Sequence, residues 1–209
     1  ALWANAIAIT SFLVAFFSPI IGAISDNRGY RKFFLIFFTL IASIFSILLF
    51  FPESGDVYLA LSLFIIANIS FEIGSVLCNS YLLELSDSKN RGLISGFAWG
   101  LGFFGGLIAL SLSFLLFPNL SSLDIRKINI LVGVWFLLFS IPAIIFLKDK
   151  KRSRFRFKYI VESFQSIRDT FYSVSKYKLI VRFLIARLFF NDALITIFAL
   201  GGVYAVGTL

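Results

Sequence analysis

The sequence predicts an all-α polytopic membrane protein, and three observations support this prediction. Hydrophobic residues make up 59% of the 209-residue chain and charged residues only 14%, which is more apolar surface than a soluble domain of this length can bury. Apolar runs recur along the chain, each close to the roughly 20 residues that a helix needs to cross a bilayer. The basic residues gather in every second loop between these runs.

Six apolar runs are predicted to form membrane-spanning helices. In order along the chain they are Trp3–Ile24, Phe33–Phe51, Val57–Leu83, Gly96–Phe117, Asn129–Leu147 and Leu179–Leu209. Short connections join the first five, which predicts antiparallel neighbours. Pro19 and Pro142 lie inside spans, where neighbouring helices or water can satisfy the carbonyls that proline leaves free.

The loop charges predict the orientation of the spans. Most of the 19 Lys and Arg residues lie in three alternate loops, which are Ser25–Lys32, Glu84–Leu93 and Lys148–Lys178. The positive-inside rule places these loops in the cytoplasm. We therefore expect an integral, multi-pass protein, located in the inner (plasma) membrane if the source is bacterial.

The last basic loop predicts a division of the chain into three parts. Residues 1–147 would form an incomplete N-terminal bundle, residues 148–178 a basic cytoplasmic linker, and residues 179–209 the first helix of a C-terminal bundle. Within the linker, apolar residues recur at helical spacing, at Ile160, Phe164, Ile167, Phe171 and Val174. This periodicity favours an amphipathic helix on the membrane surface over a solvated linker.

The composition also argues against several classes of partner. The stretch KDKKRSRFRFKY interleaves aromatic and basic residues as some RNA-binding segments do, but the membrane topology explains the charge better, so we expect no nucleic acid. The chain has no His and one Cys, Cys78, so we expect no metal, no cofactor and no intramolecular disulfide. It also lacks Met and a charged start, and we expect a piece of a longer protein.

The loop GAISDNRGYRKF, between the first two spans, carries the most informative motif. Its residues Gly22, Asp26, Gly29 and Arg31 resemble the G-x-x-x-D-x-x-G-x-[RK] loop of the major facilitator superfamily. A glycine permits close helix approach or a tight turn, and the carboxylate can face a helix N-terminus. The resemblance implies that this loop, with Lys32, latches a cytoplasmic gate.

The loop also departs from the family pattern. Asn27 and Tyr30 stand where the family usually has basic residues, although Arg28 and Lys32 keep the local charge. An ordinary basic turn is the alternative interpretation. If the match holds, the spans are helices two to seven of a twelve-helix protein, and the long basic loop falls where the family joins its two halves.

Two longer stretches resemble a narrower branch of that superfamily, the vacuole-effluxer-like proteins. They run from Asn79 to Gly106 and from Ala186 to Ala205. Leu83 and Phe190 depart from this pattern, where Pro and Tyr are expected. The eukaryotic members are linked to autophagy and amino-acid export, so the resemblance implies efflux of a small polar solute.

A polar stripe in the third span is the first candidate cavity feature. Its members, spaced 4, 3 and 4 residues apart, are Asn68, Glu72, Ser75 and Asn79. Helical geometry places them on one face. A carboxylate inside a membrane is costly, so it should face protein or a water-filled cavity. Glu72 is therefore a candidate substrate or proton site, with a structural glutamate hydrogen-bonded to a neighbouring helix as the alternative.

The last span carries a second polar set, consisting of Arg187, Asn191 and Asp192. Arg187 and Asn191 share a face, whereas Asp192 lies about 140° away from Arg187, so these two charges should not pair within the helix. The superfamily lines its cavity with its fourth and seventh helices. This implies that Glu72 and Arg187 can approach each other across it.

The fourth span is rich in glycine at helical spacing. Gly96 and Gly100 form one small-residue pair, and Gly102 and Gly106 form another. Such pairs allow close contact between helix backbones. We expect them to serve helix packing.

Together these features favour a secondary transporter that moves a small polar solute, with an amino acid as candidate substrate and protons as candidate coupling ions. Two bundles would rock around a midplane site. A non-transporting membrane scaffold is the main alternative. A membrane-embedded enzyme is the least favoured, because no nucleophile–base pair or metal set accompanies Glu72 and Asp192.

Overall fold

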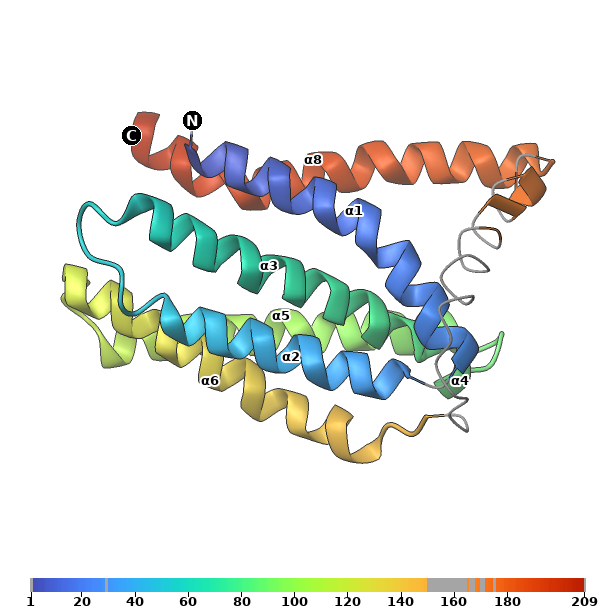
Figure 1. Ribbon diagram of the computed structural model, residues 1–209, viewed down its shortest axis with the longest axis horizontal. Coiled ribbons are helices and arrows are strands. Elements are labelled where there is room, and N and C mark those ends of the chain that lie inside the picture. Colours follow the sequence, from blue (N-terminus) through green and yellow to red (C-terminus); the bar gives the residue numbers. More distant parts are fainter. Residues whose placement is uncertain are drawn as a thin grey trace.

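A computed structural model describes residues 2–28, 30–149, 165, 168–169, 172–174 and 176–208. These residues form helices and contain no strand, so the predicted all-α fold class is confirmed. The helices, shown in Figure 1, are α1 (Leu2–Arg28), α2 (Arg31–Leu48), α3 (Val57–Ser80), α4 (Leu82–Leu85), α5 (Arg91–Leu116), α6 (Ser122–Phe146) and α8 (Lys178–Thr208).

Five of these helices are long and apolar enough to cross a membrane. The candidate spans are Leu2–Gly22, Arg31–Leu48, Val57–Leu85, Arg91–Leu116 and Ser122–Phe146. The sixth predicted span corresponds to α8, a continuous helix of 31 residues. Several of its side chains lie outside the described part of the chain, so its passage through the membrane stays a prediction.

Helix α6 begins seven residues before the predicted start at Asn129, because a capping box extends it into polar sequence. The Asp124 amide donates to Ser121 Oγ at 3.2 Å, and the Ser121 amide donates to Asp124 Oδ2 at 3.2 Å. These bonds satisfy amides that every helix start leaves without an intrahelical partner. The apolar run alone does not contain this signal.

Helix α2 lies at the centre of the packed part of the bundle, between α3 and α6 (Figure 1). Its Leu35 joins Ile73, Leu77 and Tyr81 of the α3 region in a buried cluster. Helix α1 packs mainly on α3. The packed side of the molecule is therefore α1, α3, α2 and α6, in that lateral order.

One glycine, Gly133 of α6, permits the close contact between α6 and α2. A Cβ at this position would lie 2.7 Å from the carbonyl oxygen of Ser43 and 2.6 Å from Cγ1 of Ile47. Only a residue without a side chain fits there. The two backbones thus touch along the second half of α2.

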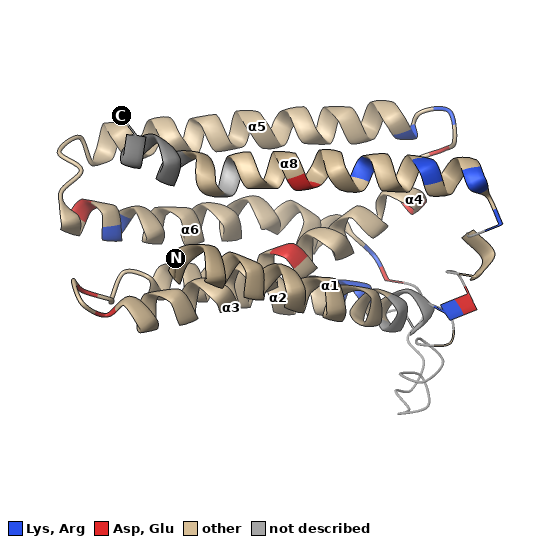
Figure 2. Cartoon of the chain, turned by 90° about the horizontal axis from the view of Figure 1, so that it is seen from above, with Lys and Arg blue, Asp and Glu red and all other residues tan. Residues whose placement is uncertain are grey.

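The other side of the molecule is more open. Figure 2 shows α5 and α8 across the bundle from α1, α2 and α3. A Cβ at any of the four predicted packing glycines of α5 would meet nothing within 4 Å in the described chain, at Gly96, Gly100, Gly102 and Gly106. Their packing role therefore stays a prediction. Large apolar side chains such as Phe97 and Leu107 are exposed on this helix, as a lipid environment permits.

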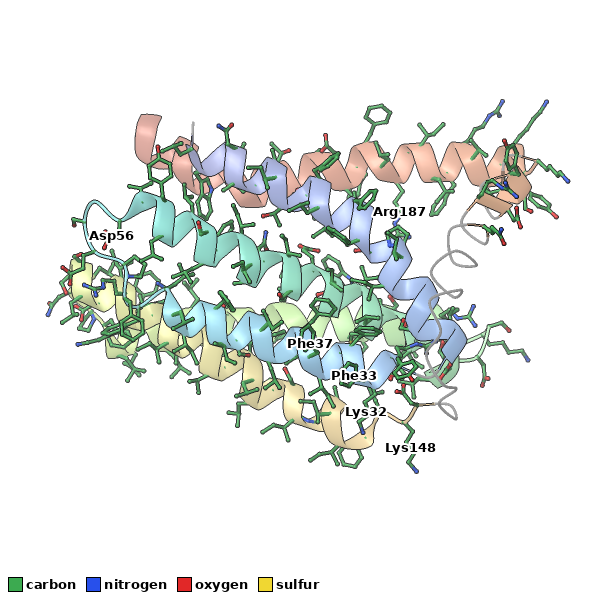
Figure 3. The ribbon with its side chains drawn as sticks, in the orientation of Figure 1. Lys32, Phe33, Phe37, Asp56, Lys148 and Arg187 are labelled. Atoms are coloured by element: carbon green, nitrogen blue, oxygen red, sulfur yellow. The ribbon has the colours of Figure 1, made fainter. Side chains whose placement is uncertain are left out.

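Charged residues lie mainly at the two ends of the bundle (Figure 2). Lys32 and Lys148 are at one end and Asp56 is at the opposite end, as Figure 3 shows. The connection between α4 and α5, residues 86–90, lies at the same end as Lys32, so the described parts of the basic loops share one side of the predicted membrane. We call this end the basic end. Its cytoplasmic location, like the division into two bundles and a linker, stays a prediction.

Candidate functional site

At the basic end, an ion pair joins the first residue of α2 to α4. Arg31 Nη1 lies 3.1 Å from Glu84 Oε1, and the two side chains are 11% and 32% exposed. The guanidinium carbon of Arg31 also lies 4.9 Å from the centre of the Tyr81 ring, at cation–π distance. The motif arginine is therefore a packed residue that connects two helices.

A carboxylate just beyond α6 enters the same region. Asp149 Oδ1 accepts a hydrogen bond from the backbone amide of Lys32 at 2.9 Å and another from the Tyr81 hydroxyl at 3.0 Å. Asp149 Oδ2 is buried and has no hydrogen-bond partner among the described residues. We call Arg31, Lys32, Tyr81, Glu84 and Asp149 the basic-end cluster.

The predicted gating residues differ in the contacts that they make. Arg31 and Lys32 belong to the cluster. Gly22 lies in α1, and a Cβ there would meet nothing within 4 Å in the described chain, so the expected close helix approach is not seen at this glycine. The side chain of Asp26 and the whole of Gly29 lie outside the described residues, and their roles stay predictions.

Sequence reasoning missed two members of the cluster, Glu84 and Asp149, and gave Tyr81 no role beyond a family resemblance. A signal was present, since both acids stand next to basic loops at the ends of predicted spans. Nothing local, however, indicates which partner each acid meets. Asp149 and Lys32 are separated by 117 positions.

The predicted polar stripe lies on α3, but its members have different surroundings. Ser75 lines a pocket of about 260 Å³ between α2, α3 and α6. Asn68 is half-buried, whereas Glu72 and Asn79 are exposed. The structure therefore brings one stripe residue to a pocket, and a shared cavity for all four stays a prediction.

The pocket itself is mainly apolar with a few polar groups. Thr39, Ser75, Cys78 and Ser140 contribute hydroxyl or thiol groups to its wall. The other lining residues are Leu35, Gly74, Phe136, Phe139, Ala143 and Ile144. Such a lining suits a small ligand or the packing of a further apolar segment.

The three predicted site residues of α8 are exposed, namely Arg187, Asn191 and Asp192. Arg187 lies between the two ends of the bundle rather than at either of them (Figure 3). In the described part of the chain, no ion pair joins Glu72 and Arg187. Their pairing stays a prediction. A search of the described residues also finds no group of three or more His, Cys, Asp or Glu that could hold a metal ion.

The antiparallel apolar helices, the lipid-compatible exterior and the basic end define a polytopic membrane protein, and comparison with known proteins places it among membrane transporters. The family described as "Vacuole effluxer Atg22 like" matches residues 2–90 and 83–209, and the chain belongs to this family. The resemblance deduced from the sequence is thereby confirmed.

Two relatives agree with this membership. The chain is 25% identical over 206 residues to the "Uncharacterized MFS-type transporter YxiO" of Bacillus subtilis (strain 168), a match that covers 95% of the chain and 48% of the relative. It is 33% identical over 147 residues to an uncharacterized protein of Aquifex aeolicus (strain VF5), covering 69% of the chain and 35% of that protein. The chain thus spans about half or less of the length of these relatives. No solved structure matches it.

Proposed function

We propose that the chain forms part of a secondary transporter that exports a small polar solute, with amino acids as the candidate substrate class, by alternating access. Residues 1–147 would belong to one bundle, and α8 would begin the second. Family membership supports the transporter class. The solute, the direction of movement and any coupling to protons belong to the proposal.

The observation that carries this proposal is the Arg31–Glu84 ion pair, on the loop whose motif resembles a transporter gate. A gate needs an element with two arrangements, and contacts at helix ends can be remade when bundles move. Arg31 is buried enough that its charge requires a partner in each state. We therefore assign the basic-end cluster to the cytoplasmic gate.

The proposed cavity lies between α3 and α8. Glu72 and Arg187 each carry a charge at membrane depth, which costs about 2.5–3.5 kcal/mol on insertion scales. Such residues face protein or water and mark the path of a solute or ion. We propose that Asn68, Glu72 and Asn79 share this cavity with Arg187, Asn191 and Asp192, whereas Ser75 lines the pocket between α2, α3 and α6.

Efflux from proteoliposomes containing the full-length protein tests the proposal, with a panel of amino acids as solutes. Glu72→Gln and Arg187→Gln should each lower transport strongly, whereas Arg182→Gln, which removes a charge from the same helix nearer the basic end, should retain it. In a double-mutant cycle with matched protein amounts, direct pairing would make the double variant less impaired than the two single effects predict.

Other outcomes would redirect the assignment. Additive losses would reject direct pairing, and full transport in both single variants would remove the cavity assignment. If the wild-type protein moves none of the solutes while folding normally, the scaffold alternative gains support.

A further inference from the structure

The N-cap residue of helix α2 does not cap the helix with its side chain. The first residue of the helix is Arg31, and the side chain of Tyr30, at the N-cap position, makes no capping hydrogen bond. The first four amides of a helix have no intrahelical acceptor. The amides at the start of α2 can therefore take an acceptor from another part of the chain.

Asp149 provides that acceptor from the far end of α6. Its Oδ1 accepts from the amide of Lys32, the second residue of α2, at 2.9 Å. A local N-cap side chain makes this same bond to the second or third amide of a helix. The negative charge of Asp149 also faces the positive end of the α2 dipole.

Tyr81 fixes the position of this carboxylate. Its hydroxyl donates to the same Oδ1 at 3.0 Å, and its side chain is buried at the end of α3. The carboxylate is thus held between α2 and α3 while its own backbone continues from α6 toward the linker. Three helix ends meet at one oxygen atom.

We infer that Asp149 is a positioning residue of the gating loop, which caps α2 from a distant part of the chain and ties the loop to the first residues after α6. This inference rests on the proposed gating role of the loop. Its consequence is that displacement of the linker start releases the first turn of α2. The gate would then respond to the conformation of the linker.

Amide hydrogen exchange in the full-length protein tests the cap without any transport measurement. Asp149→Ala should speed exchange of the Lys32 amide by about 5- to 30-fold, the range expected when a helix cap is lost. Asp149→Asn keeps an oxygen that can accept both bonds, so its exchange should stay within about threefold of wild type. Asp124→Ala is the matched control, because it removes an aspartate from the cap of α6 at the opposite end and should leave Lys32 unaffected.

Thiol labelling tests the effect on the loop. In a Cys78→Ser background, a cysteine at Tyr30, the N-cap position of α2, should react faster in Asp149→Ala than with Asp149 intact, and Asp149→Asn should restore the slower rate. Tyr81→Phe should give an intermediate rate, and adding it to Asp149→Ala should change nothing further, because the shared acceptor is already gone.

The outcomes separate this inference from the proposed function. Unchanged Lys32 exchange in Asp149→Ala would overturn the cap. Faster exchange with unchanged labelling at residue 30 would overturn the positioning role. If the wild-type protein shows no transport, exchange and labelling still decide the inference. If Asp149→Ala fails to fold, Tyr81→Phe and Asp149→Asn are compared instead. Wild-type exchange and labelling rates in both variants would overturn the contact between Tyr81 and Asp149.

Discussion

At each end of the bundle an arginine connects two segments of the chain, but its contacts differ between the two ends. At the basic end, Arg31 is packed against Tyr81 and pairs with Glu84, whose side chain is 32% exposed. At the opposite end, Arg126 of α6 pairs with Glu53, whose side chain is 73% exposed. The first pair is largely withdrawn from water, and the second is screened by it.

The Arg126 contact depends more on backbone than on charge. Its Nε donates to the Phe50 carbonyl at 2.6 Å and its Nη2 to the Phe51 carbonyl at 3.1 Å. These carbonyls follow the end of α2, where helices leave acceptors without partners. The contact therefore joins α2 to α6 mainly through main-chain acceptors. At the basic end, by contrast, Arg31 contacts the side chains of Glu84 and Tyr81, and a conformational change can exchange such partners.

The prediction with the largest expected effect concerns which end of the bundle faces the cytoplasm. In a Cys78→Ser background, cysteines placed at Asp56 and Ser121 should react with an impermeant thiol reagent in intact cells, and a cysteine at Ser88 should not. The positive-inside rule is the reason. The reverse labelling pattern would exchange the two ends and place the cluster outside the cell.

Removing the basic-end arginine should be the most damaging of the charge changes. Arg31→Gln leaves Glu84 without its ion pair, at an expected cost of about 1–3 kcal/mol in the free energy of unfolding. Unfolding in detergent would measure this loss, and transport by the full-length protein should fall as well. A double Arg31→Gln, Glu84→Gln variant should recover part of the stability, and a further loss instead would argue against direct coupling.

Removing the opposite arginine should have a smaller effect. Arg126→Gln loses hydrogen bonds to two carbonyls, with an expected cost of about 1–2 kcal/mol. Because this end lies outside the proposed gate, transport per folded molecule should change little. A selective loss of transport at normal stability would show that both ends take part in gating.

The smallest effect on stability is expected from a change at Glu53, the exposed partner of Arg126. Glu53→Gln removes the charge of a surface pair, which contributes about 0–1 kcal/mol, and the change should fade as salt increases. Unfolding at low and high ionic strength measures it. A large loss of stability that persists in high salt would show that the two ion pairs contribute similar free energies.

The sequence predicts the membrane-spanning helices well because exposure to lipid requires long apolar runs. It predicts the basic-end cluster only in part, since Arg31 belongs to a local motif while Glu84 and Asp149 meet their partners through tertiary packing. Glycine shows the same limit. The repeated glycines of α5 suggest packing, yet the close contact occurs at the isolated Gly133.

The contact at Gly133 has a mechanical consequence. Because the α6 backbone touches α2 there with no room for a methyl group, any side chain at position 133 would force the two helices apart. The spacing between α2 and α6, and with it the reach of Asp149 back to the start of α2, therefore depends on one missing side chain.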